Sequence, residues 1–162
     1  MKQDAEVRKQ LVALLQGGQA HMTFEEAVAD FPMEKINTKP PNSDYTPWRL
    51  LEHIRISQWD ILDFIQNSNY KELSWPDEYW PPKDKIATQA DWKKTIASIQ
   101  ANLKALIAIV KDPATDLYRR IPHGSGQTIL REILLVADHN AYHIGEFAIL
   151  RTVMQTWPQR AS

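Results

Sequence analysis

Two histidines, His139 and His143, lie four positions apart in the last quarter of the chain. On a helix this spacing places both imidazoles on one face, one turn apart. Buried imidazoles need partners, and a divalent metal ion is a partner that uses two or more of them at once. The pair is therefore a candidate for metal coordination.

The stretch around this pair, residues 127–155, has the pattern of one long amphipathic helix. It follows a Gly-Ser-Gly sequence at 124–126, contains no proline until Pro158, and repeats apolar residues at helical spacing. The repeating apolar residues are Ile129, Ile133, Val136, Ile144, Phe147 and Leu150. We expect the two histidines on or beside this apolar face.

A third histidine, His53, lies at the edge of the apolar stripe of another predicted helix, residues 48–66. Three imidazoles that converge on one ion leave coordination positions open, as catalytic metal sites do. The chain has no cysteine, so any metal would be held by His, Asp or Glu. Histidines bonded to backbone carbonyls in the core, or lining a surface groove, are the alternative that spacing alone leaves open.

Glu146 follows His143 by one helical turn and has two interpretations. It is a fourth ligand or a general base, or it fixes the tautomer of a neighbouring imidazole. The helix rise carries it away from a centre shared by the two histidines, which favours the second interpretation. Tyr142, Ser57 and Trp48 are candidates to line a pocket or to support the ligands, although aromatic residues beside an apolar stripe commonly pack in the core.

Several other residues have weaker signals. His21 is expected at the surface, and His123 lies in a loop where it is either solvated or overhangs the site. Arg151 is placed where a cation interacts favourably with the helix dipole. Trp75 and Trp80, in a proline-rich connection, are candidates to wall an apolar pocket above the metal.

The elements that would position these residues are helices. The predicted helices cover residues 3–16, 24–31, 48–66, 88–111 and 127–155, with an irregular loop at 32–47 and a long connection at 67–87. No stretch alternates over strand length, and no internal repeat is present. The sequence predicts an all-α four-helix bundle, with residues 1–162 forming a single domain.

Composition narrows the function classes. The 162 residues include 19 basic and 20 acidic side chains, without a basic run, so nucleic acid and anionic membranes are not the expected partners. There is no apolar run long enough for a membrane span, and the charged N-terminal residues do not resemble a signal peptide. We predict a cytoplasmic protein that acts on a small-molecule substrate.

At this point the chain resembles the DinB-like (YfiT/DinB) family. The motifs that carry the resemblance are Trp48 to His53, Gly126 to Glu132, and the run His139-x-x-x-His143-x-Gly145-Glu146-x-x-x-x-Arg151. Many members have Gln at the position of Glu146, often after a basic residue where this chain has Ile144. These departures concern position 146 and leave the three histidines matched.

The resemblance implies an up-down-down-up bundle, with the long crossover between the second and third main helices. It also implies a divalent ion, commonly zinc or nickel, with iron and manganese as alternatives, bound by His53, His139 and His143. Homodimers are frequent in the family. Characterised relatives include transferases that use low-molecular-weight thiols, a mycothiol-dependent isomerase and metal-dependent hydrolases.

Three hypotheses follow from these observations. The first is a metalloenzyme whose open three-histidine site activates a water or a thiol as a nucleophile, for thiol transfer or for hydrolysis. The second is a dimeric binding or sensing module in which the metal is structural. The third is a metal-free helical scaffold with a dry or water-filled cavity.

Overall fold

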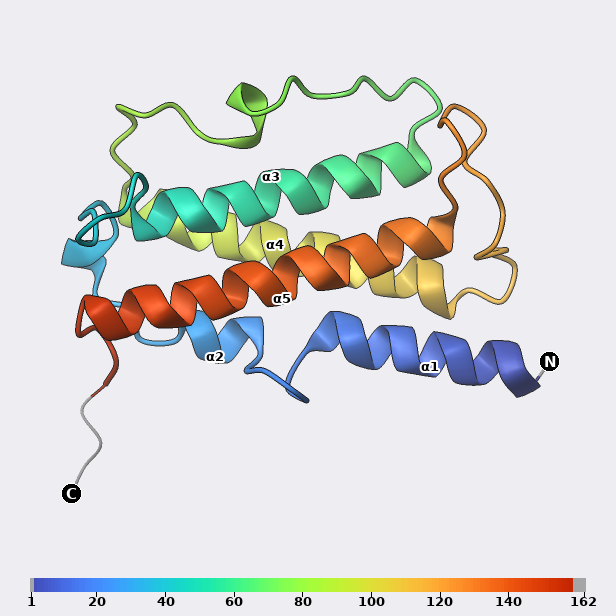
Figure 1. The fold of residues 1–162 in the computed structure, drawn as a ribbon, viewed down its shortest axis with the longest axis horizontal. Helices are drawn as coiled ribbons and strands as arrows, with labels where there is room; N and C mark the ends of the chain where they lie inside the picture. Colours follow the sequence, from blue (N-terminus) through green and yellow to red (C-terminus); the bar gives the residue numbers. More distant parts are fainter. Residues whose placement is uncertain (1, 159–162) are drawn as a thin grey trace.

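Four long helices lie side by side along the longest axis of the molecule (Figure 1). The computed structural model describes residues 2–158. Its helices are α1 (Lys2–Gln16), α2 (Phe24–Val28), α3 (Pro47–Gln66), α4 (Gln89–Lys111) and α5 (Ile129–Val153), with 3₁₀ helices η1 (Met33–Lys35) and η2 (Asp77–Tyr79). Helices α1 and α3 each pack against both α4 and α5, which makes a four-helix bundle.

The directions of the helices confirm the predicted topology. In Figure 1, α3 and α4 run from left to right, whereas α1 and α5 run from right to left. The connection from α3 to α4 returns along the whole bundle, and α2 continues the line of α1. The fold is therefore all-α and up-down-down-up, and within residues 2–158 no helix is long and apolar enough to cross a membrane.

Threonine caps explain where the long helices begin. Thr46, Thr88 and Thr128 each precede a helix, and each side-chain oxygen accepts a hydrogen bond from the backbone N–H three residues later. At Thr88 the carboxylate of Asp91 bonds back to the threonine N–H, which completes a capping box. Pro47 occupies the first turn of α3, where its missing N–H costs nothing.

The second helix is shorter than the pattern predicts. We expected it to reach Phe31, but α2 ends at Val28 because Ala29 has an extended backbone and Asp30 has a φ of 51°. A non-glycine residue in this left-handed region marks a turn. The loop expected to be irregular at 32–47 also contains a 3₁₀ turn, η1. Helix α3 begins at Pro47, which is the last residue of that expected loop.

Two clusters of buried apolar side chains fill the bundle and meet near its middle. One includes Leu50 and Ile54 of α3 with Phe147 of α5. The other includes Ile61 of α3 and Ile133 of α5, together with α1 and α4. On α5, His139 and His143 lie between the two clusters, whereas on α3 His53 lies among residues of the first cluster. Some apolar residues of the helices lie outside the core, since Leu14 is 48% exposed and Val153 is 51% exposed.

Arg151 anchors the end of α5 to the segment that follows α2. Its side chain is fully buried, and Nη1 donates to the carbonyl oxygens of Ala27 and Ala29 at 2.8 and 2.7 Å. Nη2 donates to the carbonyl of Thr156 at 2.7 Å, and the guanidinium lies 4.0 Å from the ring centroid of Trp157. This network is a larger role than the helix-dipole interaction predicted for Arg151.

The long connection is held against α3 by its tyrosines. Tyr79 and Tyr70 both donate their hydroxyl hydrogens to the carboxylate of Asp60, at 2.7 and 2.9 Å. The backbone carbonyl of Tyr79 lies 2.8 Å from Nδ1 of His53. The connection therefore covers the part of α3 that carries the first histidine.

Candidate metal centre

The structure brings the three predicted histidines together. His53 comes from α3 and the other two from α5, and one ligand nitrogen from each lies within 4.8 Å of the others. Nε2 of His53 and Nε2 of His139 are 3.3 Å apart. His53 and His143 are buried and His139 is partly buried, so the cluster lies at the edge of the core.

The spacing of these nitrogens suits a metal ion. Zinc lies about 2.0–2.1 Å from histidine nitrogens in a tetrahedral site, so two such nitrogens are about 3.3 Å apart. The distance between Nε2 of His53 and Nε2 of His139 has this value. The remaining separations are at most 4.8 Å, which a small rotation of one ring would shorten. The residues present therefore fit a divalent ion.

Two of the three rings are fixed by hydrogen bonds at their other nitrogen. Nδ1–H of His53 donates to the backbone carbonyl of Tyr79 at 2.8 Å, which leaves Nε2 with a free lone pair. Nδ1 of His143 lies 2.7 Å from Oε2 of Glu146, so its Nε2 is also left free. Ligand histidines in metalloproteins characteristically have such partners.

The environment keeps the imidazoles neutral. Burial lowers the pKa of His53. Burial and the neighbouring His53 lower the pKa of His139 to about 4, against an opposing effect of Asp138. Burial, followed by the other two histidines, lowers the pKa of His143 to about 3. A neutral imidazole has the lone pair that a metal ion requires.

Glu146 contacts His143 as a hydrogen-bond acceptor. The two groups are at ion-pair distance, 2.7 Å, but the lowered pKa of His143 means that its ring is neutral at pH 7. Burial raises the pKa of Glu146 from its ordinary value. The contact is therefore a bond from a neutral Nδ1–H to the carboxylate, which is stronger than a bond between neutral groups.

Trp80 of the long connection covers His53. The two rings are stacked, with centroids 4.1 Å apart and planes 3° apart. Trp75, the other tryptophan expected in a pocket wall, is largely exposed and its ring contacts Tyr79. The sequence placed Trp80 near the site as one of two candidates, but it gave no signal for the carbonyl of Tyr79, because any residue supplies a backbone carbonyl.

The three candidate supporting residues lie in different environments. Trp48 is buried and donates its indole N–H to Thr95 at 3.2 Å, and Ser57 is buried one turn after His53. Tyr142 is 70% exposed, and its ring meets the ring of His143 edge-on at 4.9 Å. Their roles at the site stay predictions.

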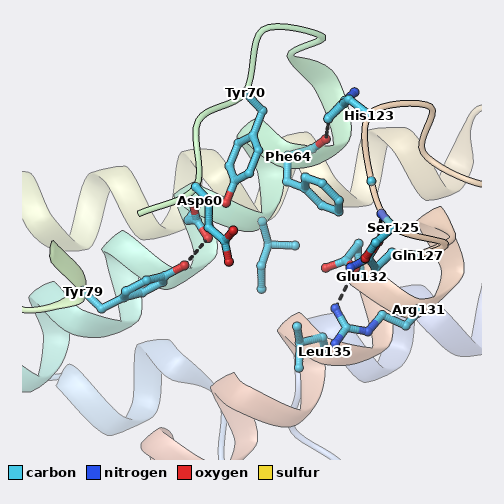
Figure 2. A pocket seen from close by; sticks show the side chains of 13 residues that line it. Asp60, Phe64, Tyr70, Tyr79, His123, Ser125, Gln127, Arg131, Glu132 and Leu135 are labelled. Carbon is cyan, nitrogen blue, oxygen red and sulfur yellow. Dashed lines mark hydrogen bonds and ion pairs between the residues drawn. The ribbon is translucent and has the colours of Figure 1, made fainter. Parts of the chain in front are cut away.

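A cavity of about 500 Å³ with both polar and apolar walls lies between α3, α5 and the long connection, and none of the three clustered histidines lines it. Figure 2 shows Asp60 and Tyr79 on one side of it, and Glu132 with Arg131 on the other. Arg131 and Glu132 form an ion pair at 2.7 Å. Burial raises the pKa of Asp60, and the hydrogen bonds from Tyr79 and Tyr70 oppose this effect.

The cavity and the histidine cluster share Tyr79. Its carbonyl contacts His53, and its hydroxyl contacts Asp60 in the cavity wall. His123 also lines this cavity, where its Nε2 lies 2.8 Å from the carbonyl of Phe64 (Figure 2), and it is not one of the three clustered histidines. His21 is half-buried and its Nδ1 lies 2.8 Å from the carbonyl of Met22.

Comparison with protein families gave one match. The family model described as the DinB superfamily matches residues 6–147, a range that contains all three clustered histidines and Glu146. The comparison with curated proteins found no match, and neither did the comparison with solved structures.

Proposed function

Since this chain belongs to the DinB superfamily, we propose that it is a metal-dependent enzyme with a divalent ion at His53, His139 and His143. The convergence of three neutral imidazoles from two helices carries this proposal. Two of the rings have hydrogen-bond partners that leave Nε2 free, which favours coordination over a purely structural cluster. The imidazole set suits zinc or nickel, with iron and manganese as alternatives.

The ion would lower the pKa of a water or a low-molecular-weight thiol and so supply a nucleophile at neutral pH. The residues of this chain prepare the site for that chemistry. The carbonyl of Tyr79 and the carboxylate of Glu146 orient two of the imidazoles. Trp80 holds the ring of His53 in place and excludes water from one of its faces.

The substrate would bind in the cavity that shares Tyr79 with the cluster. Its volume of about 500 Å³ is within the range of small-molecule sites, and its walls combine apolar and polar groups. The reaction would be transfer of a thiol to an electrophile, or hydrolysis. The proposed location is the cytoplasm.

A second candidate is a dimeric binding or sensing module with a structural metal. Its support is that Glu146, the carboxylate that contacts the cluster, is already bonded to His143. The face of α5 away from the core also exposes large apolar side chains at helical spacing, which suits contact with a second copy. These side chains are Leu134, Tyr142, Ile149 and Val153.

Elemental analysis tests the metal site directly. The protein is purified without a polyhistidine tag, and bound metal is measured in the wild type and in a His139→Ala, His143→Ala double variant. We expect about one divalent ion per wild-type chain and a nearly complete loss in the double variant. His123→Ala is the matched control, because His123 lies in the neighbouring cavity. Equal metal content in the wild type and the double variant would show that these histidines do not bind the metal.

Turnover separates the two candidates. The metal-loaded protein is assayed with low-molecular-weight thiols and electrophiles, and with esters and amides, before and after chelation. Metal-dependent turnover supports the enzyme. A metal-bound protein that dimerises, as measured by light scattering, and converts nothing on these panels supports the binding module.

A further inference from the structure

Two arginines of this bundle are almost completely buried, and they differ in how they are satisfied. Arg151 donates to three carbonyl oxygens and lies over an aromatic ring. Arg49 is 6% exposed, and its guanidinium makes one hydrogen bond within the described part of the chain, from Nη1 to the carbonyl of Pro82 at 2.7 Å. Its Nε is buried without a partner, as is the Nε of Arg151, so the two side chains differ in the bonds of their terminal nitrogens.

A buried charge is costly unless it is paired, so the position of Arg49 needs an explanation. No ion pair between Arg49 and a carboxylate is found among residues 2–158. Burial lowers the pKa of Arg49 without an opposing acidic neighbour. Most N–H donors of the Arg49 guanidinium therefore have no hydrogen-bond acceptor among residues 2–158.

This guanidinium lines a cavity of about 550 Å³. The cavity lies between the residues that precede α3 and the proline-rich part of the long connection. Its walls include the rings of Tyr45 and Trp80, which stack with centroids 5.3 Å apart, and three prolines, Pro76, Pro81 and Pro82. An apolar cavity with one convergent charged group is the usual form of a small-molecule site.

The other charged residues of the cavity do not neutralise Arg49. Asp44, Asp77 and Lys83 line it as well, and all three are exposed to solvent, where water and salt screen their charges. The buried guanidinium is screened much less. Its planar fork is suited to the two oxygens of a carboxylate.

We propose that this cavity binds a small organic carboxylate, with its charge on the guanidinium of Arg49 and its apolar body against Tyr45 and Trp80. Arg49 precedes His53 by one turn of α3, and Trp80 stacks on both Tyr45 and His53. The ligand therefore lies next to the histidine cluster without contacting it. The site does not depend on the metal, and it exists in the metal-free protein.

Benzoate is the probe, because it combines a carboxylate with an apolar ring. Metal-free protein is titrated with benzoate and, separately, with uncharged benzamide, by calorimetry. We expect saturable benzoate binding, and binding about tenfold weaker or worse for benzamide and for the Arg49→Gln variant, since a charge-assisted hydrogen bond is lost. Lys83→Gln removes an exposed cation from the same cavity and should change the affinity by less than about twofold.

NMR of the wild-type protein tests the proposal even if the Arg49→Gln variant does not fold. In the wild type, benzoate should shift the Nε–H signal of Arg49 and the indole N–H signal of Trp80, and benzamide should shift the former little. Absence of saturable benzoate binding at millimolar concentrations overturns the proposal. Equal weakening by Arg49→Gln and Lys83→Gln also overturns it. Loss of the metal site in the His139→Ala, His143→Ala variant leaves benzoate binding intact, so this proposal and the metal proposal fail separately.

Discussion

Nε2 of His53 and Nε2 of His139 lie 3.3 Å apart, although 86 positions separate the two residues in the chain. The antiparallel packing of α3 and α5 produces this relationship, because buried residues such as Leu50 and Phe147 fix the two helices against each other close to the histidines. A ligand pair held by packed helices needs little rearrangement to bind an ion. The site is therefore expected to contribute to stability when it is loaded.

Metal removal should lower thermal stability. An ion that binds only the folded chain stabilises it by about 2.7 kcal/mol at a free concentration 100 times its Kd. For a chain of this size that corresponds to roughly 5–10 °C in Tm. Calorimetry of the loaded and chelated protein measures the difference, and the His139→Ala, His143→Ala variant is the control in which chelation should change nothing. Identical Tm values for the loaded and chelated wild type would contradict metal binding at this site.

Replacement of Glu146 should distinguish its two possible roles. Glu146→Ala removes the acceptor for Nδ1–H of His143, and we expect metal affinity to fall about 10–100-fold. Glu146→Gln keeps an uncharged acceptor and should lose less. Competition with a fluorescent chelator measures both affinities. If the affinity of both variants equals that of the wild type while turnover is lost, Glu146 acts as a base and does not orient the ring.

The pKa of Asp60 predicts a pH dependence of stability. Burial raises this pKa in the folded protein, so the unfolded chain releases the proton more easily. The stabilising contribution is then complete below the ordinary pKa of 3.8 and is lost as pH rises through the folded pKa. Relative to Asp60→Asn, the wild type should lose about 1.4 kcal/mol for each unit by which the pKa is raised. Urea unfolding of both proteins between roughly pH 3.5 and 7.5 tests the sign. If the free energy of unfolding of the wild type, relative to that of Asp60→Asn, rises with pH or stays constant, the prediction is wrong.

The sequence predicted the parts of this site that depend on helical periodicity. The spacing of His139 and His143 and the apolar stripes follow from local rules, and the structure has the long helices where these rules place them. The family resemblance added the topology, which the fold confirms.

Contacts made by the long connection were beyond sequence reasoning. Residues 67–87 have no periodicity that fixes their path, so neither the carbonyl of Tyr79 on His53 nor the two hydroxyls on Asp60 had a signal. The stack of Trp80 on His53 was foreseen only as a general pocket wall. The burial of Arg49 and Arg151 was missed as well, because arginine is normally exposed and a single sequence carries no pattern for its exceptions.

Replacement by methionine should lower the stability of the protein much more at Arg151 than at Arg49. Arg151→Met leaves the carbonyls of Ala27, Ala29 and Thr156 without their donor, and we expect a loss of about 3 kcal/mol or more in the free energy of unfolding. Arg49→Met removes a buried charge that has one hydrogen bond, so stability should change by less than about 1 kcal/mol or increase.

Urea unfolding measures both variants, with Arg120→Met as the control, because that arginine is exposed. A residue that can be replaced by an apolar one without loss of stability is not there to hold the fold together. If Arg49→Met were instead as destabilising as Arg151→Met, the guanidinium of Arg49 would be a structural anchor for the carbonyl of Pro82, and its place in the cavity wall would need no ligand to explain it.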